Sequence, residues 1–114
     1  MKPIIKSVFT WDHVNIRTWE PINPNVIAET VYIDIGPDTK KRADSFSIRV
    51  ATPAGLSNLE VHEGVIATRP LLIIDSYDYD NLWAWLVKTV KSCESNTWNA
   101  SVEKLRLHFD WEYD

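Results

Sequence analysis

The sequence predicts an α+β fold with a mainly antiparallel sheet, an αα-hairpin packed on one sheet face, and one short helix. Residues 26–36 (VIAETVYIDIG) and 44–53 (DSFSIRVATP) alternate apolar and polar side chains, as half-buried strands do. Two later segments, which begin at Asp78 and Thr97, place apolar residues at helical spacing instead. A chain of 114 residues is the size of one domain, so residues 1–114 are expected to form a single domain.

The first element is expected to be an edge strand over residues 4–9, followed by an irregular stretch. Pro21 and Pro24 exclude regular structure from that stretch, because proline lacks a backbone donor and has a fixed φ. Trp11 and Trp19 lie there without helical or strand spacing. Large rings bury well even from a loop, so both are expected to close the rim of the core.

The two alternating segments are expected to pair as an antiparallel hairpin across the charged turn between them. Their inward face carries apolar residues at every second position: Ile27, Val31, Ile33, Ile35, Phe46, Ile48 and Val50. Thr52 and Pro53 then predict a short helix that ends near Leu59, with threonine at the cap and proline in the first turn. Residues 62–68 are expected to be a connection.

The apolar run at residues 71–74 (LLII) predicts a central strand that is covered on both faces. This strand leads into an amphipathic helix capped by Asp78, whose carboxylate can accept N–H groups of the first turn. The helix has one buried stripe: Leu82, Leu86, Thr89, Val90 and Cys93.

Thr97 is expected to cap a second helix, which follows the first after a link of a few residues. Trp98, Val102, Leu105 and Phe109 repeat along one face of this helix over three turns. Because the link is short, the two helices are predicted to form an antiparallel αα-hairpin. The predicted element order is β-β-β-α-β-α-α.

Composition excludes several classes of protein. The net charge of −4 argues against a nucleic-acid-binding protein and favours a basic partner. The longest apolar run is far shorter than the roughly 20 residues of a membrane-spanning helix. A single cysteine cannot form an internal disulfide, and no apolar signal segment follows Met1, so a cytoplasmic protein is expected.

No catalytic, cofactor or metal site is expected. Cys93 lies on the apolar helix stripe with no histidine near it in sequence, which indicates a buried structural thiol. The acidic run at 75–80 lacks the glycine and distal glutamate of a calcium loop. The histidines are isolated and lack the spacing of metal ligands: His13, His62 and His108. An enzymatic function finds no support in the sequence.

The tryptophan content favours a protein-binding module. Six tryptophans in 114 residues exceed what a small core needs, and Trp and Tyr are enriched at protein interfaces. Residues 110–114 (DWEYD) form an aromatic anchor inside an acidic patch. The competing interpretation is that Trp111 packs back on the sheet and Glu112 pairs internally. The candidate partner-binding residues are Asp110, Trp111, Glu112, Tyr113, Trp19, Glu20 and Trp85.

A series of short motifs runs in order along nearly the whole chain. They are Pro21 after an aromatic-acid pair, Ile35-Gly36-Pro37, Phe46-Ser47-Ile48-Arg49-Val50 before Thr52-Pro53, Arg69 before Leu72-Ile73-Ile74, Tyr77-Asp78-Tyr79, Thr97-Trp98, Lys104-Leu105 and Trp111-Glu112. In this order and spacing, the chain resembles the immunity protein 8 family of bacterial polymorphic toxin systems. It departs from the family pattern at Gly55-Leu56, where a Trp-Leu pair is usual, and at Ala100, where an acid is usual.

The resemblance implies a small cytoplasmic α+β protein that binds and neutralises a cognate toxin made from a neighbouring gene. The acidic segment favours a toxin with a basic cleft, such as a nuclease. The alternative is a non-enzymatic scaffold that forms homodimers through the free sheet face. That face is expected to carry Tyr32, Asp34, Ser47 and Arg49. No cofactor, metal, nucleic acid or membrane is expected as a partner.

Overall fold

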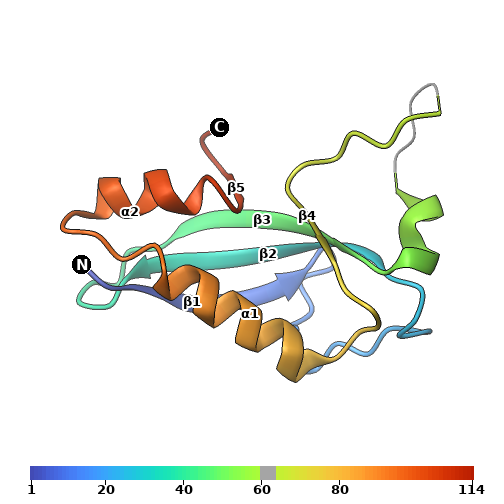
Figure 1. The fold of residues 1–114 in the computed structure, drawn as a ribbon. Helices are drawn as coiled ribbons and strands as arrows, with labels where there is room; N and C mark the ends of the chain where they lie inside the picture. The colour runs from blue at the N-terminus through green and yellow to red at the C-terminus, as the bar shows by residue number, and fades with distance from the viewer. Residues whose placement is uncertain (60–63) are drawn as a thin grey trace.

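The structure, a computed structural model, describes residues 1–59 and 64–114. Within these residues the chain has an α+β fold, as predicted (Figure 1). The elements in chain order are β1 Pro3–Thr10, β2 Ala28–Pro37, β3 Asp44–Ala51, the 3-10 helix η1 Pro53–Asn58, β4 Leu71–Ile73, α1 Tyr79–Lys91, α2 Trp98–Leu105 and β5 Asp110–Trp111. His62, one of the three isolated histidines, lies outside the described residues.

The strands form one mixed sheet in the order β1-β2-β3-β4, and β5 pairs with β3 as well. The pairs β1–β2, β2–β3 and β3–β5 are antiparallel, whereas β3–β4 is parallel. The sheet is therefore mainly antiparallel, as expected, and β1 is an edge strand. Both β4 and β5 lie along the outer side of β3, one after the other (Figure 1).

The register of the central hairpin confirms the predicted inward face. Ile33 lies opposite Phe46, and Val31 lies opposite Ile48. All seven residues predicted to point inward are buried, with Ile33 and Ile35 fully so. Because side chains alternate along a strand, the residues between them point to the other side of the sheet.

The prediction of a central strand at residues 71–74 is wrong. β4 has three residues, lies at the edge of the sheet, and leaves Ile73 48% exposed. Leu72 and Ile74 pack against the core from this edge position. The apolar run therefore covers one rim of the core, and an unbroken apolar sequence alone does not distinguish that role from double-sided burial.

Hydroxyl and carboxylate caps start the helices where the sequence predicts. Asp78 Oδ1 accepts a hydrogen bond from the Asn81 N–H at 3.3 Å, and Thr97 Oγ1 accepts one from the Ala100 N–H at 3.1 Å. The predicted stripes of both helices are buried, with Leu86 completely inaccessible. The second helix ends at Leu105 and is shorter than expected, and a turn carries Phe109 into the core.

The short helix after β3 begins at Pro53, as predicted, but is a 3-10 helix. The buried Thr52 hydroxyl accepts from the N–H groups of Gly55 and Ile27, so it joins η1 to the start of β2. A Cβ atom at Gly55 would overlap the Ile27 carbonyl. Glycine at this departure from the family pattern therefore lets η1 lie directly against the backbone that leads into β2.

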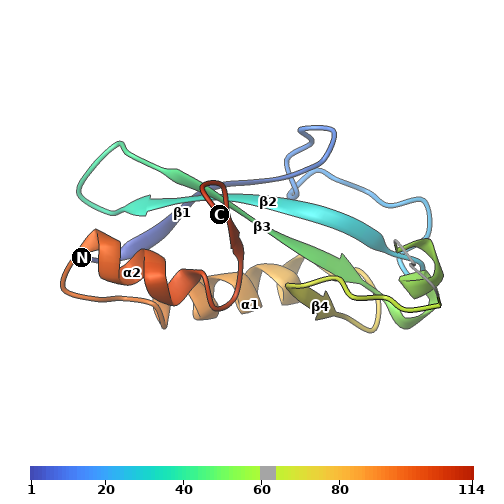
Figure 2. The same ribbon diagram turned by 90° about the horizontal axis from the view of Figure 1, so that it is seen from above.

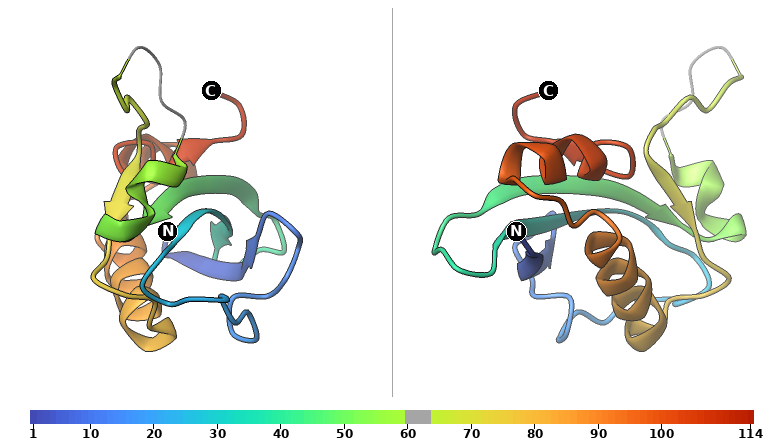
Figure 3. Two further views of the ribbon diagram at one scale, coloured as in Figure 1. Left: turned by 90° about the vertical axis from the view of Figure 1, so that its right-hand side faces the viewer. Right: turned by 60° about the vertical axis from the view of Figure 1, so that its left-hand side comes forward.

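Both α-helices lie on the same side of the sheet (Figures 2 and 3). α1 packs against β1, whereas α2 lies toward β3 (Figure 1). The predicted packing as an antiparallel αα-hairpin is not confirmed, because each helix takes its place on the sheet beside a different strand. The core lies between these helices and the inward face of the sheet.

Candidate partner-binding site

The seven residues predicted to bind a partner lie in three separate parts of the fold. Trp19 and Glu20 belong to the loop after β1, Trp85 to α1, and Asp110, Trp111, Glu112 and Tyr113 to the segment that contains β5. Trp85 packs against Phe109, which precedes the last group, whereas Trp19 packs against Tyr77.

Two of the candidate tryptophans have internal packing partners. Trp19 is half-buried and meets the edge of the Tyr77 ring, with ring centroids 4.8 Å apart. The Tyr77 hydroxyl in turn donates to the Ile16 carbonyl at 3.1 Å. Trp19 thus contacts Tyr77, which packs against the core. Trp85 is also half-buried and packs edge-on against Phe109 at 6.1 Å.

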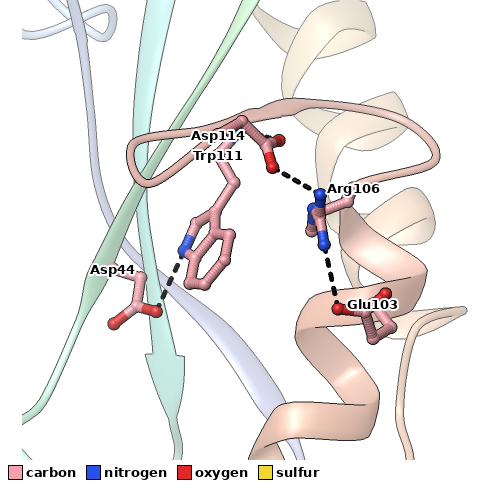
Figure 4. A network of polar contacts seen from close by, with 5 residues as sticks. All are labelled: Asp44, Glu103, Arg106, Trp111 and Asp114. Atoms are coloured by element: carbon pink, nitrogen blue, oxygen red, sulfur yellow. Dashed lines mark hydrogen bonds and ion pairs between the residues drawn. The ribbon is translucent and has the colours of Figure 1, made fainter.

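Trp111 is anchored to the domain by a polar network (Figure 4). Its indole Nε1 donates to the Asp44 carboxylate at 3.1 Å, and the Arg106 guanidinium lies 5.4 Å from its ring centroid. Arg106 also pairs with Asp114 and with Glu103. Hydrogen bonds to Asp114 and then Glu103 raise the pKa of the Arg106 guanidinium. These contacts favour the interpretation that Trp111 packs back on the sheet.

The acidic neighbours of Trp111 point elsewhere. Trp111 pairs with Phe46, which is buried, and Asp110 pairs with Ser47. Paired residues of adjacent strands share a sheet face, so Asp110 lies on the face opposite the helices. The next amide, that of Glu112, donates to the Ser45 carbonyl at 3.0 Å, and its side chain is exposed. Glu112 follows the end of β5 in a turn, which the Asp114 N–H closes by donating to the Trp111 carbonyl at 2.9 Å.

The face of the sheet opposite the helices is here called the open face. By register it carries residues from β1, β2, β3 and β5: Ser7, Phe9, Thr30, Tyr32, Asp34, Ser45, Ser47, Arg49 and Asp110. These side chains are half-buried or exposed. The Ser7 hydroxyl donates to the Asp34 carboxylate at 2.7 Å, which fixes one acid on this face. Within residues 1–59 and 64–114, no helix crosses the open face (Figure 2).

Aromatic rings gather at one end of the open face. Phe9 and Tyr32 stack with centroids 5.7 Å apart, His13 stacks on Phe9 at 5.5 Å, and Trp11 leans over Tyr32 at 6.4 Å. Together with Asp12 they line a hollow of about 530 Å³, here called the aromatic cup. Trp11 is 68% exposed, so the prediction that it closes the core rim is wrong. The loop that follows β1 lies on the side of the sheet away from the helices (Figure 2).

The loop that forms the aromatic cup has a fixed backbone. The Thr10 N–H donates to the Val14 carbonyl, and the His13 N–H donates to the Thr10 carbonyl, both at 2.9 Å. Asn15 forms a bridge with Phe9. These bonds hold His13 at a φ of 61°, a conformation that costs a histidine more than a glycine. A strained residue held this way beside exposed rings is typical of a binding loop.

Sequence reasoning missed the role of Phe9, Trp11 and His13 as an exposed cluster. The signal was present, because Val8 points inward in the predicted edge strand and Phe9 must therefore point outward. The alternation in the second predicted strand also places Tyr32 on the open face. What the sequence does not reveal is the antiparallel register that sets Phe9 directly opposite Tyr32.

Two further features bear on the class of protein. Among residues 1–59 and 64–114, no group of three or more His, Cys, Asp or Glu side chains could hold a metal ion. Within the same residues, no helix is long and apolar enough to cross a membrane.

A sheet with helices on one side and exposed aromatic rings on the other is typical of a small domain that binds another macromolecule. The chain belongs to the Immunity protein 8 family, whose model matches residues 4–114. Searches against curated proteins and against solved structures each gave no significant match.

Proposed function

We propose that this protein binds one cognate toxin domain and neutralises it by stoichiometric blockade, without catalytic turnover. Membership of the Immunity protein 8 family carries this proposal, since an immunity protein requires a toxin as its partner. The proposal places the complex in the cytoplasm of the cell that makes both proteins. There the toxin must be held inactive before it reaches its target.

The open face is the docking surface we propose for the toxin. It lies opposite the helices, and its exposed rings supply the large rigid contact area that protein interfaces favour. The acids that the register assigns to it are Asp34 and Asp110, and Glu112 follows β5, whereas Arg49 is a cation on the same face. An acidic surface of this kind attracts a basic partner.

A toxin that acts on nucleic acid would have a basic surface, because such an enzyme must bind phosphates. A nuclease is therefore the toxin class we favour. The net charge of −4 would speed the encounter between the two proteins at low salt. In this proposal the segment 110–114 contributes its two outward acids, while Trp111 holds the segment in place.

Self-association through the open face is the second candidate function. The face carries both Asp34 and Arg49, so two copies related by a twofold axis could pair unlike charges. Sedimentation of the protein alone separates the two proposals. A monomer that forms a one-to-one complex with toxin supports blockade, and a stable homodimer that toxin does not alter supports the scaffold.

The decisive experiment is co-expression with the toxin domain encoded next to this gene, followed by co-purification and an activity assay. We expect an inactive complex of equal stoichiometry, and we expect toxin activity to return after denaturing separation and refolding. Protection at far below one equivalent, or a toxin that is chemically altered after separation, would contradict blockade and support an enzymatic mechanism.

A further inference from the structure

We infer that the aromatic cup binds the guanidinium group of one arginine on the surface of the toxin. The inference rests on the proposed function and specifies which part of the partner the open face recognises. It is carried by three observations: the ring geometry of the cup, its charge, and the way this chain uses its own arginines.

The cup presents the exposed indole of Trp11 to a planar cation, beside the stacked rings of His13, Phe9 and Tyr32. Phe9 and Tyr32 are inclined by only 17°, and Trp11 is inclined by 39° to Tyr32. The hollow they line opens to solvent beside the exposed indole of Trp11. A guanidinium is flat and weakly hydrated, so it stacks on such rings more readily than the compact ammonium of lysine does.

The charge of the cup favours a cation. Asp12 lines the hollow, and its charge reaches Glu29 of β2, which lies opposite Val50 and lines a different hollow. Burial raises the pKa of Glu29, the Trp11 backbone lowers it by hydrogen bonding, and the negative charge of Asp12 raises it again. The positive charge of Arg49, which lies on β3 opposite Thr30, lowers that pKa. Asp12 is thus the carboxylate that lines the hollow, and its negative charge would attract a bound cation.

Elsewhere in the fold, this chain covers aromatic rings with arginines of its own. Arg17 lies over Tyr79, Arg42 over Trp98 and Arg106 over Trp111, at 5.4 to 5.9 Å. No such contact involves a ring of the cup within the described residues. Trp11 and Tyr113 are exposed rings with acidic neighbours and no arginine over them among the described residues, and Trp11 lines a hollow together with further rings.

The test measures the affinity of the full-length protein for a catalytically inactive toxin domain, with variants on both sides. The cup variants are Trp11→Ala, Trp11→Phe, Tyr32→Ala and Asp12→Asn. Leu107→Ala serves as the matched control, because Leu107 is 81% exposed and follows α2, away from the cup. Each surface arginine of the toxin is replaced in turn by glutamine and by lysine, and thermal unfolding checks that every variant folds.

We expect Trp11→Ala and Tyr32→Ala to weaken binding by about tenfold or more, as residues at the centre of an interface do. Trp11→Phe keeps a ring face and should stay within about threefold of the wild type. Asp12→Asn should weaken binding and reduce its salt dependence. One toxin arginine should be sensitive to both replacements, and its effect should disappear when combined with Trp11→Ala.

The contrary outcomes separate the two proposals. If wild-type protein forms no complex with the toxin, both the proposed function and the cup fail. If the complex forms but Trp11→Ala and Asp12→Asn each change affinity by less than about twofold, as Leu107→Ala should, only the cup fails. If Trp11→Ala weakens binding but every toxin arginine can be replaced by lysine without loss, the cup does not recognise a guanidinium.

Discussion

The indole of Trp111 and the carboxylate of Asp44 are joined by a hydrogen bond of 3.1 Å, although the two residues lie 67 positions apart in the chain. Asp44 is only 5% exposed, and Arg42 Nε, at 3.5 Å, is its ion-pair partner. The bond ties β5 to the first residue of β3, and it thereby determines which side chains of segment 110–114 remain available to a partner (Figure 4).

Trp111→Phe keeps an aromatic ring but removes the donor to Asp44. A buried carboxylate that loses one of two partners is destabilised, so we expect unfolding to become easier by about 1–3 kcal/mol. Tyr113→Phe is the control, because Tyr113 is 71% exposed and should tolerate the change. Equal denaturant midpoints for the two variants would show that the indole–carboxylate bond does not hold β5.

Leu86→Ala removes a fully buried side chain from the middle of the α1 stripe. The lost contacts and the resulting cavity should cost about 2–5 kcal/mol of unfolding free energy. Val87→Ala, one residue further along the same helix, is the matched control because Val87 is 41% exposed. A loss of less than about 1 kcal/mol for Leu86→Ala, measured by denaturant and thermal unfolding, would contradict its place in the core.

These two variants reflect how far the sequence predicts the fold. The strand and helix periods alone place Leu86, Ile33 and Phe46 in the core, because each period fixes which residues share a face. Capping residues such as Asp78 also predict where helices begin, since their hydrogen bonds are local. Strands that form only by pairing with a distant part of the chain cannot be predicted from these local patterns.

β4 and β5 illustrate the limit. Both are short, and both exist because they pair with β3, so their position depends on tertiary contacts more than on local propensity. The apolar run at residues 71–74 predicts a central strand, because the sequence does not show that this segment pairs with β3 alone.

Trp11 shows the same limit for the candidate site. The large ring of tryptophan favours burial, yet the hydrogen-bonded loop after β1 turns Trp11 outward and leaves it 68% exposed.

The thiol of Cys93 should react slowly in the native protein and rapidly once the protein is unfolded. It is 1% exposed and donates to the Thr89 carbonyl at 3.3 Å. Burial raises the pKa of the Cys93 thiol, opposed by the Ser92 hydrogen bond and the charge of Lys104, so little thiolate forms near neutral pH. Labelling with a thiol reagent, with and without denaturant, checks this. Fast native labelling with loss of toxin protection would reopen an enzymatic interpretation.

Tyr77 should make the protein less stable at alkaline pH. Burial, followed by the charges of Tyr79 and Asp78, raises the pKa of the Tyr77 phenol from 10.0 to about 12. In the unfolded chain the phenol ionises at its ordinary value. Between these two values the unfolded state therefore holds fewer protons, and stability falls as the pH rises. The measurement is the unfolding midpoint between pH 9 and pH 12, conditions chosen to bracket both values.

Tyr77→Phe removes the ionisable group and should flatten that alkaline decline, at the cost of the hydrogen bond to the Ile16 carbonyl. Tyr113→Phe removes an exposed phenol instead and should keep the decline of the wild type. If both variants lose stability with the same slope as the wild type, Tyr77 is not the group responsible.

Glu112→Lys tests whether the acidic side of segment 110–114 contacts the toxin. The Glu112 side chain is exposed, and its backbone amide, which the substitution retains, bonds to the Ser45 carbonyl. Folding should therefore be unchanged. If the complex buries this carboxylate, reversing its charge should weaken toxin binding by about 2–5 kcal/mol. Glu94→Lys is the control, because it makes the same charge change in the exposed link between α1 and α2.

Salt dependence distinguishes a contact on the open face from a general effect of net charge. Both variants change the net charge by the same amount, so long-range steering should decline similarly in each. Only Glu112→Lys should also speed dissociation, and wild-type association should slow with added salt more than that of Glu112→Lys. A lower unfolding midpoint for Glu112→Lys with toxin affinity unchanged would make the segment purely structural. The toxin would then have to dock at the aromatic cup or beside Trp19, without the acids next to β5.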